Sequence, residues 1–320
     1  MEPILTPNEK RFCIYPISHD DLWAAYKRSV ACFWTVEEIE LDRDKAEFNN
    51  QLTKEEQDFI KFILAFFASS DGIVNENIAE RFLREVQYPE ARCFYTMQLQ
   101  IESIHSEMYS LLIDTLVADV NEKERLFHAT KTISAVAAKA DWALKWIQDG
   151  NFAERLVAFA CVEGIHFSSS FCAIYWLKSR GICLNGLGKS NEFIARDEGL
   201  HRDFALLLYR NHLESKLSTQ RFHEIVRSAV QVEQLFVRES LTLNLRGMNQ
   251  HMMCDYVEFV ADHLLKSAGV DPLFNTANPF LWMESISLEG KSNFFECRVS
   301  EYAKQQSSSV ALEECFDAEF

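Results

Sequence analysis

The chain has 320 residues, of which 48% are apolar and 25 are phenylalanine, so it can bury a large core. Its 48 acidic residues outnumber 32 basic ones and give a formal net charge of −16, which argues against nucleic acid as a partner. The longest apolar run, near 62–68, is much too short to span a membrane, and no signal-peptide pattern opens the chain. Nine scattered cysteines without a C-x-x-C motif indicate reduced thiols. We therefore expect a cytoplasmic protein with no membrane attachment.

The first third of the chain reads as an arm followed by helices. Residues 1–17 contain three of the six prolines and are expected to form an extended N-terminal arm. A helix should begin after His19-Asp20, and the capping-box pattern at 35–38 predicts a short second helix. A second capping box at 53–56 predicts a helix of roughly 30 residues, and Pro89 is suited to the first turn of the next helix.

The middle of the chain contains no proline between Pro89 and Pro272, which predicts a stack of long helices. Turn signals at 119–121, 149–151, 181–190 and 214–219 divide it into helices of about 20 to 30 residues. Helices of this length joined by short turns are typical of a helix bundle. A helical pattern continues to about Lys266 and ends at Gly269. With no strand alternation, we predict an all-α fold: one helical domain over 18–300 and a loose acidic tail over 301–320.

Two Glu-x-x-His motifs, Glu102 to His105 and Glu198 to His201, are the main candidates for function. A carboxylate and an imidazole three residues apart on a helix point toward the same spot, so each motif can present two ligands to one metal ion. Both motifs fall on apolar stripes, where an unpaired charge is too costly to bury unless a positive group meets it. The sequence therefore predicts buried metal ions.

Each motif follows a lone acid on an apolar stripe. Asp71 precedes Glu102 by 31 residues, and Glu163 precedes Glu198 by 35, as expected for antiparallel helix pairs that return to the same height. Four carboxylates and two neutral imidazoles sum to −4, which two divalent cations cancel, and this mixed ligation suits iron or manganese. The predicted ligands are Asp71, Glu102, His105, Glu163, Glu198 and His201. Glu163 also begins a third Glu-x-x-His motif, and spacing alone leaves His166 open as a ligand.

Apolar residues are expected to surround this site. Tyr109 follows His105 by one helical turn, where a plain core aromatic is the common alternative. Phe167 and Phe171 follow Glu163 by one and two turns, and Ile194 precedes Glu198 by one turn. These side chains would exclude water from a reactive centre.

Five segments resemble the small, radical-generating subunit of class I ribonucleotide reductase, of the eukaryotic and large-DNA-virus type. They are SDGIVNEN from Ser70, QIESIHSEMYSLLIDT from Gln100, KADWALKWI from Lys139, VEGIHFSSSF from Val162 and ARDEGLHRDFA from Ala195. The resemblance runs from about Arg11 to Phe320. It implies a ferritin-like bundle, a homodimer, and two iron ions, with manganese less expected, at the six predicted ligands.

The resemblance also implies roles for individual residues. Tyr109 matches the tyrosine that is oxidised to a stable radical when the reduced metal site reacts with O2, inside a pocket matched by Phe167, Phe171 and Ile194. Trp34 and Asp197 match members of the radical-transfer route, although a core aromatic is the simpler interpretation of Trp34 from sequence alone. Tyr302 matches the tyrosine that passes the radical to the large subunit, and the terminal FDAEF matches the tail that docks there.

Two departures and two alternatives accompany this interpretation. His166 stands where similar chains carry an apolar residue, and the N-terminal extension of cellular members is absent, as in a short viral form. An iron-storage or oxygenase protein would not explain the acidic tail or the enclosed Tyr109. A non-enzymatic helical scaffold would not explain charged residues on core stripes.

Overall fold

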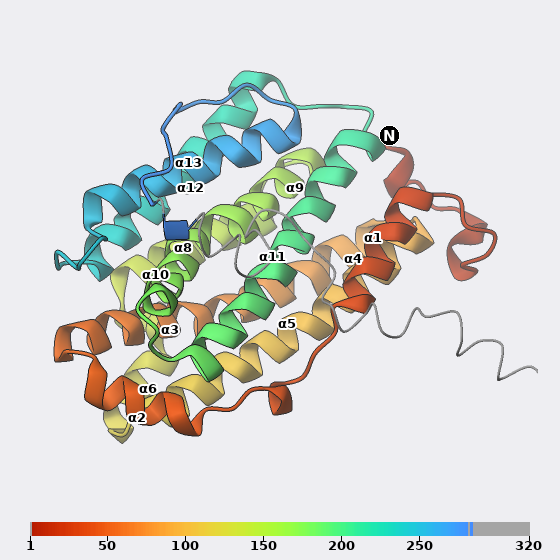
Figure 1. Ribbon diagram of the computed structural model, residues 1–320. Helices are drawn as coiled ribbons and strands as arrows, with labels where there is room; N and C mark the ends of the chain where they lie inside the picture. The colour runs from red at the N-terminus through yellow and green to blue at the C-terminus, as the bar shows by residue number, and fades with distance from the viewer. Residues whose placement is uncertain (1, 281, 284–320) are drawn as a thin grey trace, which may run out of the picture.

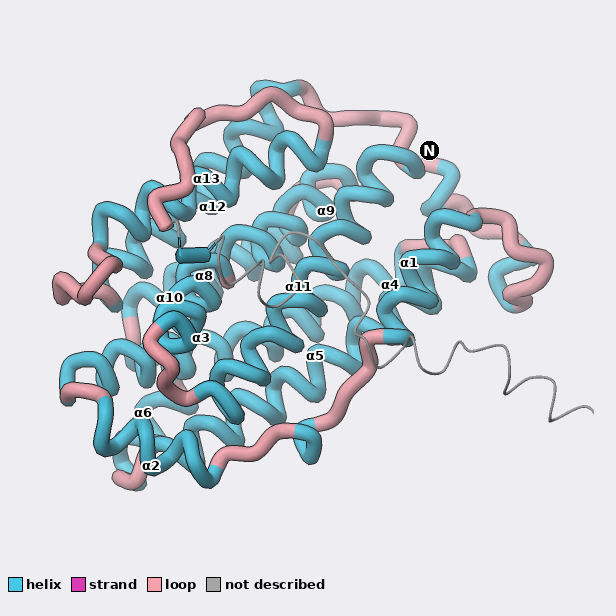
Figure 2. The backbone as a smooth tube through the Cα atoms, viewed as in Figure 1, coloured by secondary structure: helices cyan, strands magenta, loops and turns pink. Residues whose placement is uncertain are grey.

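The computed structural model describes residues 2–280 and 282–283, apart from the side chains of Lys10, Arg11 and Asp71. Within that part the regular structure is helical, and the only strand-like feature is an isolated bridge between Leu245 and Met248 (Figure 2). The all-α prediction is therefore confirmed. The predicted tail over 301–320, with Tyr302, lies outside the described residues.

Thirteen α-helices are found among the described residues. They are α1 (Asp20–Ala31), α2 (Asp42–Gln51), α3 (Lys54–Asn77), α4 (Leu83–Glu85), α5 (Pro89–Leu116), α6 (Val120–Phe127), α7 (Ala129–Thr132), α8 (Ser134–Gln148), α9 (Phe152–Cys161), α10 (Ser168–Ser179), α11 (Lys189–Leu207), α12 (Thr219–Ser240) and α13 (Gln250–Ala268). Short 3-10 turns are η1 (Pro3–Leu5), η2 (Glu9–Phe12) and η3 (Val36–Glu38). Wider π-helical turns are η4 (Ile78–Phe82), η5 (Val162–His166), η6 (Leu184–Gly188) and η7 (Leu208–His212).

Local sequence signals account for several helix ends. The Thr53 hydroxyl accepts a hydrogen bond from the Glu56 amide, and the Glu56 carboxylate accepts one from the Thr53 amide, so the predicted capping box is confirmed. Pro89 occupies the first turn of α5, where no amide hydrogen is needed. Gly269 ends α13 with φ of 75°, a left-handed conformation that favours glycine.

The helices form one bundle around a continuous core (Figure 1). α5 packs against α3 on one side and α1 on another, while α11 packs against α9. α12 and α13 pack on each other, and α12 also contacts α8, α9 and η5. The inward faces of the central helices α3, α5, α9–α10 and α11 are therefore buried and can hold a dry site.

Two stretches differ from the sequence prediction of long uninterrupted helices. Residues 117–149 form the short α6 and α7 before the 15-residue α8, and residues 241–249 form a loop between α12 and α13. That loop turns at Gly247, which has φ of 80°. The predicted turn at 181–190 is also shorter, because η6 and α11 already occupy its second half.

The stretch Phe152–Ser179, which joins α9, η5 and α10, is long and apolar enough to cross a membrane by length and composition. Its apolar window is 100% buried inside the bundle. Burial of that kind is typical of the central helix of a large core. This stretch carries Glu163 and both predicted pocket phenylalanines, Phe167 and Phe171.

Candidate metal centre

Three helical segments bring the predicted acids and imidazoles together at the centre of the bundle. Glu102 and His105 lie on α5, Glu198 and His201 on α11, and Glu163 on η5, and each is at most 1% exposed. Ligand atoms of Glu102, Glu163, Glu198 and His201 all lie within 4.8 Å of one another. The backbone of Asp71 belongs to α3, which packs along α5, and its side chain lies outside the description.

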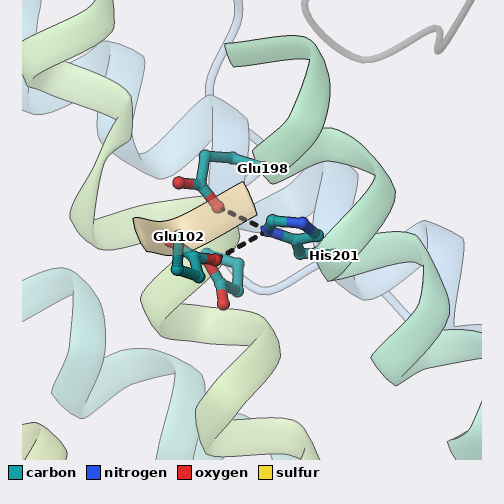
Figure 3. A group of neighbouring side chains, drawn as sticks. Glu102, Glu198 and His201 are labelled. Carbon is teal, nitrogen blue, oxygen red and sulfur yellow. Dashed lines mark hydrogen bonds and ion pairs between the residues drawn. The ribbon is translucent and has the colours of Figure 1, made fainter. Parts of the chain in front are cut away.

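Glu102 and Glu198 each face both imidazoles. One Glu102 oxygen lies 3.4 Å from Nδ1 of His105, and the other lies 2.9 Å from Nδ1 of His201. Glu198 repeats this arrangement at 3.2 Å and 3.0 Å. Figure 3 shows both carboxylates directed at the His201 ring. Because each carboxylate offers one oxygen to each of the two imidazoles, Glu102 and Glu198 could help to hold cations beside both histidines.

Protons on the two histidines balance part of the negative charge of this cluster. Among the described side chains, Glu102 and Glu198 find ion-pair partners only in His105 and His201. Burial lowers the pKa of His201, but Glu102 and Glu198 outweigh burial and raise it to about 9. Burial likewise opposes the charged form of His105, yet Asp197, Glu102 and Glu198 raise its pKa well above the usual range. Each imidazole therefore binds a proton where a cation would otherwise compensate the acids.

A hydrogen-bonded route leads outward from His105. Its Nε2 lies 3.3 Å from Oδ2 of Asp197, and the same oxygen accepts a hydrogen bond from the Trp34 indole at 2.8 Å. Arg196 donates to the other Asp197 oxygen at 2.9 Å. Burial raises the pKa of Asp197, but Arg196, His105 and Trp34 reverse this effect and hold it below the usual range. Asp197 thus remains a carboxylate that orients His105 with Nδ1 toward the cluster.

An aromatic layer encloses Tyr109, which is 2% exposed. Its ring stacks on Phe67 with centroids 4.4 Å apart and planes only 5° from parallel. Phe67 in turn lies 5.8 Å from Phe167 and 5.2 Å from Phe171. Ile194 is completely buried one turn before Glu198. A layer of this kind excludes water from the space beside the cluster.

Two further residues belong to this site and were not among those predicted from the sequence. Gln98 is fully buried and donates a hydrogen bond to Glu163 at 3.1 Å, and Phe67 lies between Tyr109 and the other phenylalanines. Both had a signal in the sequence. Gln98 precedes Glu102 by one turn as another polar residue on a core stripe, and Phe67 precedes Asp71 by one turn on a stripe already identified.

His166 is not among the side chains gathered at the cluster. Its ring packs edge-on against Trp142 with centroids 4.8 Å apart. Burial, and secondarily Lys139, lower its pKa well below the usual range, so the ring is neutral. Its neighbour Gly164 allows a close approach of α11, because a Cβ there would lie 2.8 Å from Cδ of Arg202. The turn η5 therefore directs Glu163 to the cluster while His166 contacts α8.

The donor atoms present fit a pair of hard or borderline divalent cations. In the described structure, Nδ1 of His105 and both oxygens of Glu102 are buried without a hydrogen-bond partner, although the oxygens lie close to imidazole nitrogens. Such groups are costly to bury unless they coordinate an ion. The carboxylate-rich set with two imidazoles matches the ligand preference of iron or manganese. Fold and site together define a ferritin-like helical protein with a dimetal centre.

Comparison with known proteins shows which family of dimetal proteins this chain resembles. The family described as "Ribonucleotide reductase, small chain" matches residues 11–279. The chain is 55% identical over 305 residues to the ribonucleoside-diphosphate reductase small subunit of Dictyostelium discoideum, covering 95% of this chain and 90% of that protein. It is 56% identical over 305 residues to the small chain of Vaccinia virus (strain Ankara), covering 95% of both. The solved structure of the Rnr4 homodimer from Saccharomyces cerevisiae has a TM-score of 0.81 at 37% identity, over 91% of this chain and 92% of that one.

The chain belongs to the ribonucleotide reductase small-chain family. It is the small, dimetal-site subunit of a ribonucleoside-diphosphate reductase and acts with a large subunit. The resemblance inferred from the five sequence segments is thereby confirmed, as is the ferritin-like fold.

Proposed function

We propose that the cluster holds two iron ions and that Tyr109 is the residue oxidised to the stable radical of this subunit. The observation that carries the proposal is the pair of carboxylates, Glu102 and Glu198, each facing both His105 and His201. Glu163 and Asp71 would complete the set of six ligands. Bound iron would supply, with O2, the oxidising power that converts a tyrosine to its neutral radical. We favour iron over manganese from the family resemblance, since the donor set suits both.

The protein's own contribution is to hold and protect the tyrosine. Tyr109 lies one helical turn beyond His105, so its ring is beside the cluster without belonging to it. Phe67 stacks on one face of that ring, and Phe167 and Phe171 extend the apolar layer, while Ile194 packs near the α11 ligands. A neutral radical survives only where water and reductants are excluded, and this layer provides such a place.

Tyr109 is tested by a phenylalanine substitution. Ferrous iron added anaerobically and followed by air should give a tyrosyl radical signal in electron paramagnetic resonance, and Tyr109→Phe should abolish it while iron still binds. Tyr95→Phe is the matched control, because Tyr95 is also fully buried on α5 and stacks on Phe82. A signal that persists in Tyr109→Phe would refute the assignment. Metal analysis of the same samples tests the choice of iron.

We further propose that the radical leaves the site through His105, Asp197 and Trp34 and reaches the large subunit through Tyr302 and the tail over 301–320. The support inside the bundle is the continuous set of hydrogen bonds from His105 Nε2 to the Trp34 indole. The support for the tail is its sequence: spaced apolar residues in an acidic segment ending in Phe320.

The radical-transfer route and the tail are tested by the same two measurements, radical formation and ribonucleotide reduction. Trp34→Phe, which keeps an aromatic ring but removes the indole donor, and deletion of residues 301–320 should each leave the Tyr109 radical able to form. Both should abolish ribonucleotide reduction when the large subunit is added, because the radical can no longer be transferred. Loss of the radical itself on tail deletion would give the tail a structural role instead.

Three broader features of the subunit remain proposals. A homodimer is supported by the homodimeric yeast relative, and analytical ultracentrifugation of the purified chain tests it. A cytoplasmic location is supported by seven free cysteines among the described residues, and cell fractionation tests it. A single domain over 18–300 is supported by the continuous core of its described part, and limited proteolysis should cleave outside it.

A further inference from the structure

Lys139 of α8 and Glu233 of α12 form a buried ion pair outside the carboxylate cluster. They are 2% and 0% exposed, and Nζ of Lys139 lies 2.5 Å from Oε2 of Glu233. The same ammonium lies between two aromatic faces, 3.5 Å from the ring centre of Phe66 and 3.6 Å from that of Phe236. The lysine is therefore held from several directions, and cation–π contacts of this kind are strongest when water is excluded.

This pair is bonded directly to the turn that carries Glu163. Lys139 donates a hydrogen bond of 2.6 Å to the carbonyl of His166, the last residue of η5. The Ser169 hydroxyl, in the first turn of α10, donates to the other oxygen of Glu233. A π-helical turn interrupts the regular i to i−4 ladder, so side-chain partners at its end help to define its shape. Lys139 and Glu233 therefore hold the end of η5 between α8 and α12.

The pair also contacts the aromatic layer around Tyr109. The Phe66 ring, which lies under the Lys139 ammonium, is 5.3 Å from the ring of Phe167, the residue that directly follows η5. Phe167 then contacts Phe67, on which Tyr109 stacks. Lys139 therefore contacts both the backbone of η5, the turn that carries Glu163, and the ring of Phe66, which lies next to the aromatic layer around Tyr109.

We propose that Lys139 and Glu233 are positioning residues for radical formation, which fix the Glu163 turn and the packing of the aromatic layer against Tyr109. This inference rests on the proposed function. Well-packed apolar side chains often match or exceed a buried ion pair in stability, so stability alone does not account for the pair. What the pair adds is a defined orientation of the turn, because Lys139 donates a hydrogen bond to the His166 carbonyl and Glu233 accepts one from the Ser169 hydroxyl. Burial lowers the pKa of Lys139 to about 8 despite the opposing effect of Glu233, which reflects the cost of placing a charge there.

The test must separate positioning from folding, because a single substitution leaves one buried charge unpaired. Lys139→Met and Glu233→Gln are therefore combined in a double variant that has no unpaired charge at this place. The control is Lys61→Met, which removes another lysine with a mostly buried side chain, also in an ion pair, with Glu122 at 2.9 Å. Lys61 lies on α3, and neither the cluster nor the aromatic layer is among its ion-pair partners.

Two measurements on the full-length chain then decide the proposal. Anaerobic titration with ferrous iron should show an affinity roughly 10-fold or more weaker in the double variant, the effect typical of residues that orient metal ligands. After exposure to air, its radical signal should change in hyperfine pattern, because the couplings of the tyrosine β-hydrogens follow the orientation of the ring. The thermal midpoint of the double variant should remain near that of the wild-type chain, and Lys61→Met should keep wild-type affinity and spectrum.

Unchanged iron affinity together with an unchanged spectrum in the double variant would overturn the proposal and leave the pair a structural role only. If the wild-type chain binds iron but forms no radical, the proposed role of Tyr109 fails, while the affinity measurement still decides whether the pair positions the Glu163 turn. A wild-type chain that binds no iron would overturn both inferences.

Discussion

Two groups of buried charge in the same bundle differ in how their charge is balanced. Lys139 and Glu233 supply one cation and one anion, so this pair is complete within the chain. Around the metal centre, the carboxylates of Glu102, Glu163 and Glu198 outnumber His105 and His201, whose rings are cationic only when protonated. The first group holds helices together, whereas the second has an excess of negative charge that it cannot neutralise by itself.

This difference indicates which buried charges bind something. Burying an ion is costly, so an uncompensated cluster persists only if protons or cations complete it. The raised pKa values of His105 and His201 are the response of the metal-free protein to that excess. In the balanced pair the shifts follow burial instead: the pKa of Lys139 is lowered and that of Glu233 is raised.

The largest expected effect that separates the two groups is stabilisation by metal. Ferrous iron that binds only the folded protein should stabilise it by about 4 kcal/mol when free iron exceeds the dissociation constant a thousandfold. Glu198→Gln should lose most of this gain, because Glu198 faces both imidazoles. Anaerobic guanidinium denaturation with and without iron measures the difference.

The control for that experiment is Glu192→Gln. It makes the same chemical change on the same helix, at a partly exposed residue paired with Lys178. It should keep the full iron-induced gain. If Glu198→Gln gained as much as the wild-type chain, the cluster would not be where iron binds.

The buried cluster of carboxylates and imidazoles was predictable from sequence because its signal is local. Glu102 and His105, or Glu198 and His201, are three residues apart on one helix, and each interrupts an apolar stripe whose period is visible without any tertiary information. The capping box at Thr53 and the turn at Gly269 are local in the same sense, and both were placed correctly.

Features that depend on distant residues could not be obtained in this way. Lys139 and Glu233 are 94 positions apart, so the local sequence around one residue does not indicate that it pairs with the other. The surroundings of η5 are equally hidden, since it packs against Arg202 and accepts a hydrogen bond from Lys139, both of which are distant in sequence. The break over 241–249 was overlooked because it contains no proline, although Gly247 gave a weaker signal.

A smaller effect that sharpens the comparison is the pH dependence of the metal-free protein. The folded-state pKa of His201 is raised to about 9, above the unfolded value near 6.5, so the folded chain binds more protons between these limits. The stability contributed by His201 is therefore fully present below pH 6.5 and is lost as the pH rises toward 9. Between pH 6.5 and 8 the loss from His201 alone should be about 2 kcal/mol, from 1.36 kcal/mol per pKa unit, and His105, whose pKa is also raised, adds to it in the same direction.

Groups whose lowered pKa values make stability rise with pH act mainly outside this pH window. His166, with a lowered pKa, acts mainly below pH 6.5, and Lys139, whose pKa is about 8, adds stability only as the pH rises beyond 8. Denaturation of chelator-treated protein at several pH values measures the slope. His201→Gln should reduce it and leave the part that His105 contributes, whereas His223→Gln, at a partly exposed residue, should not change it. Iron-loaded protein should show little slope, because a bound cation replaces the protons. A slope that is unchanged in His201→Gln would mean that the negative cluster is balanced elsewhere, and the contrast with the Lys139 pair would then be wrong.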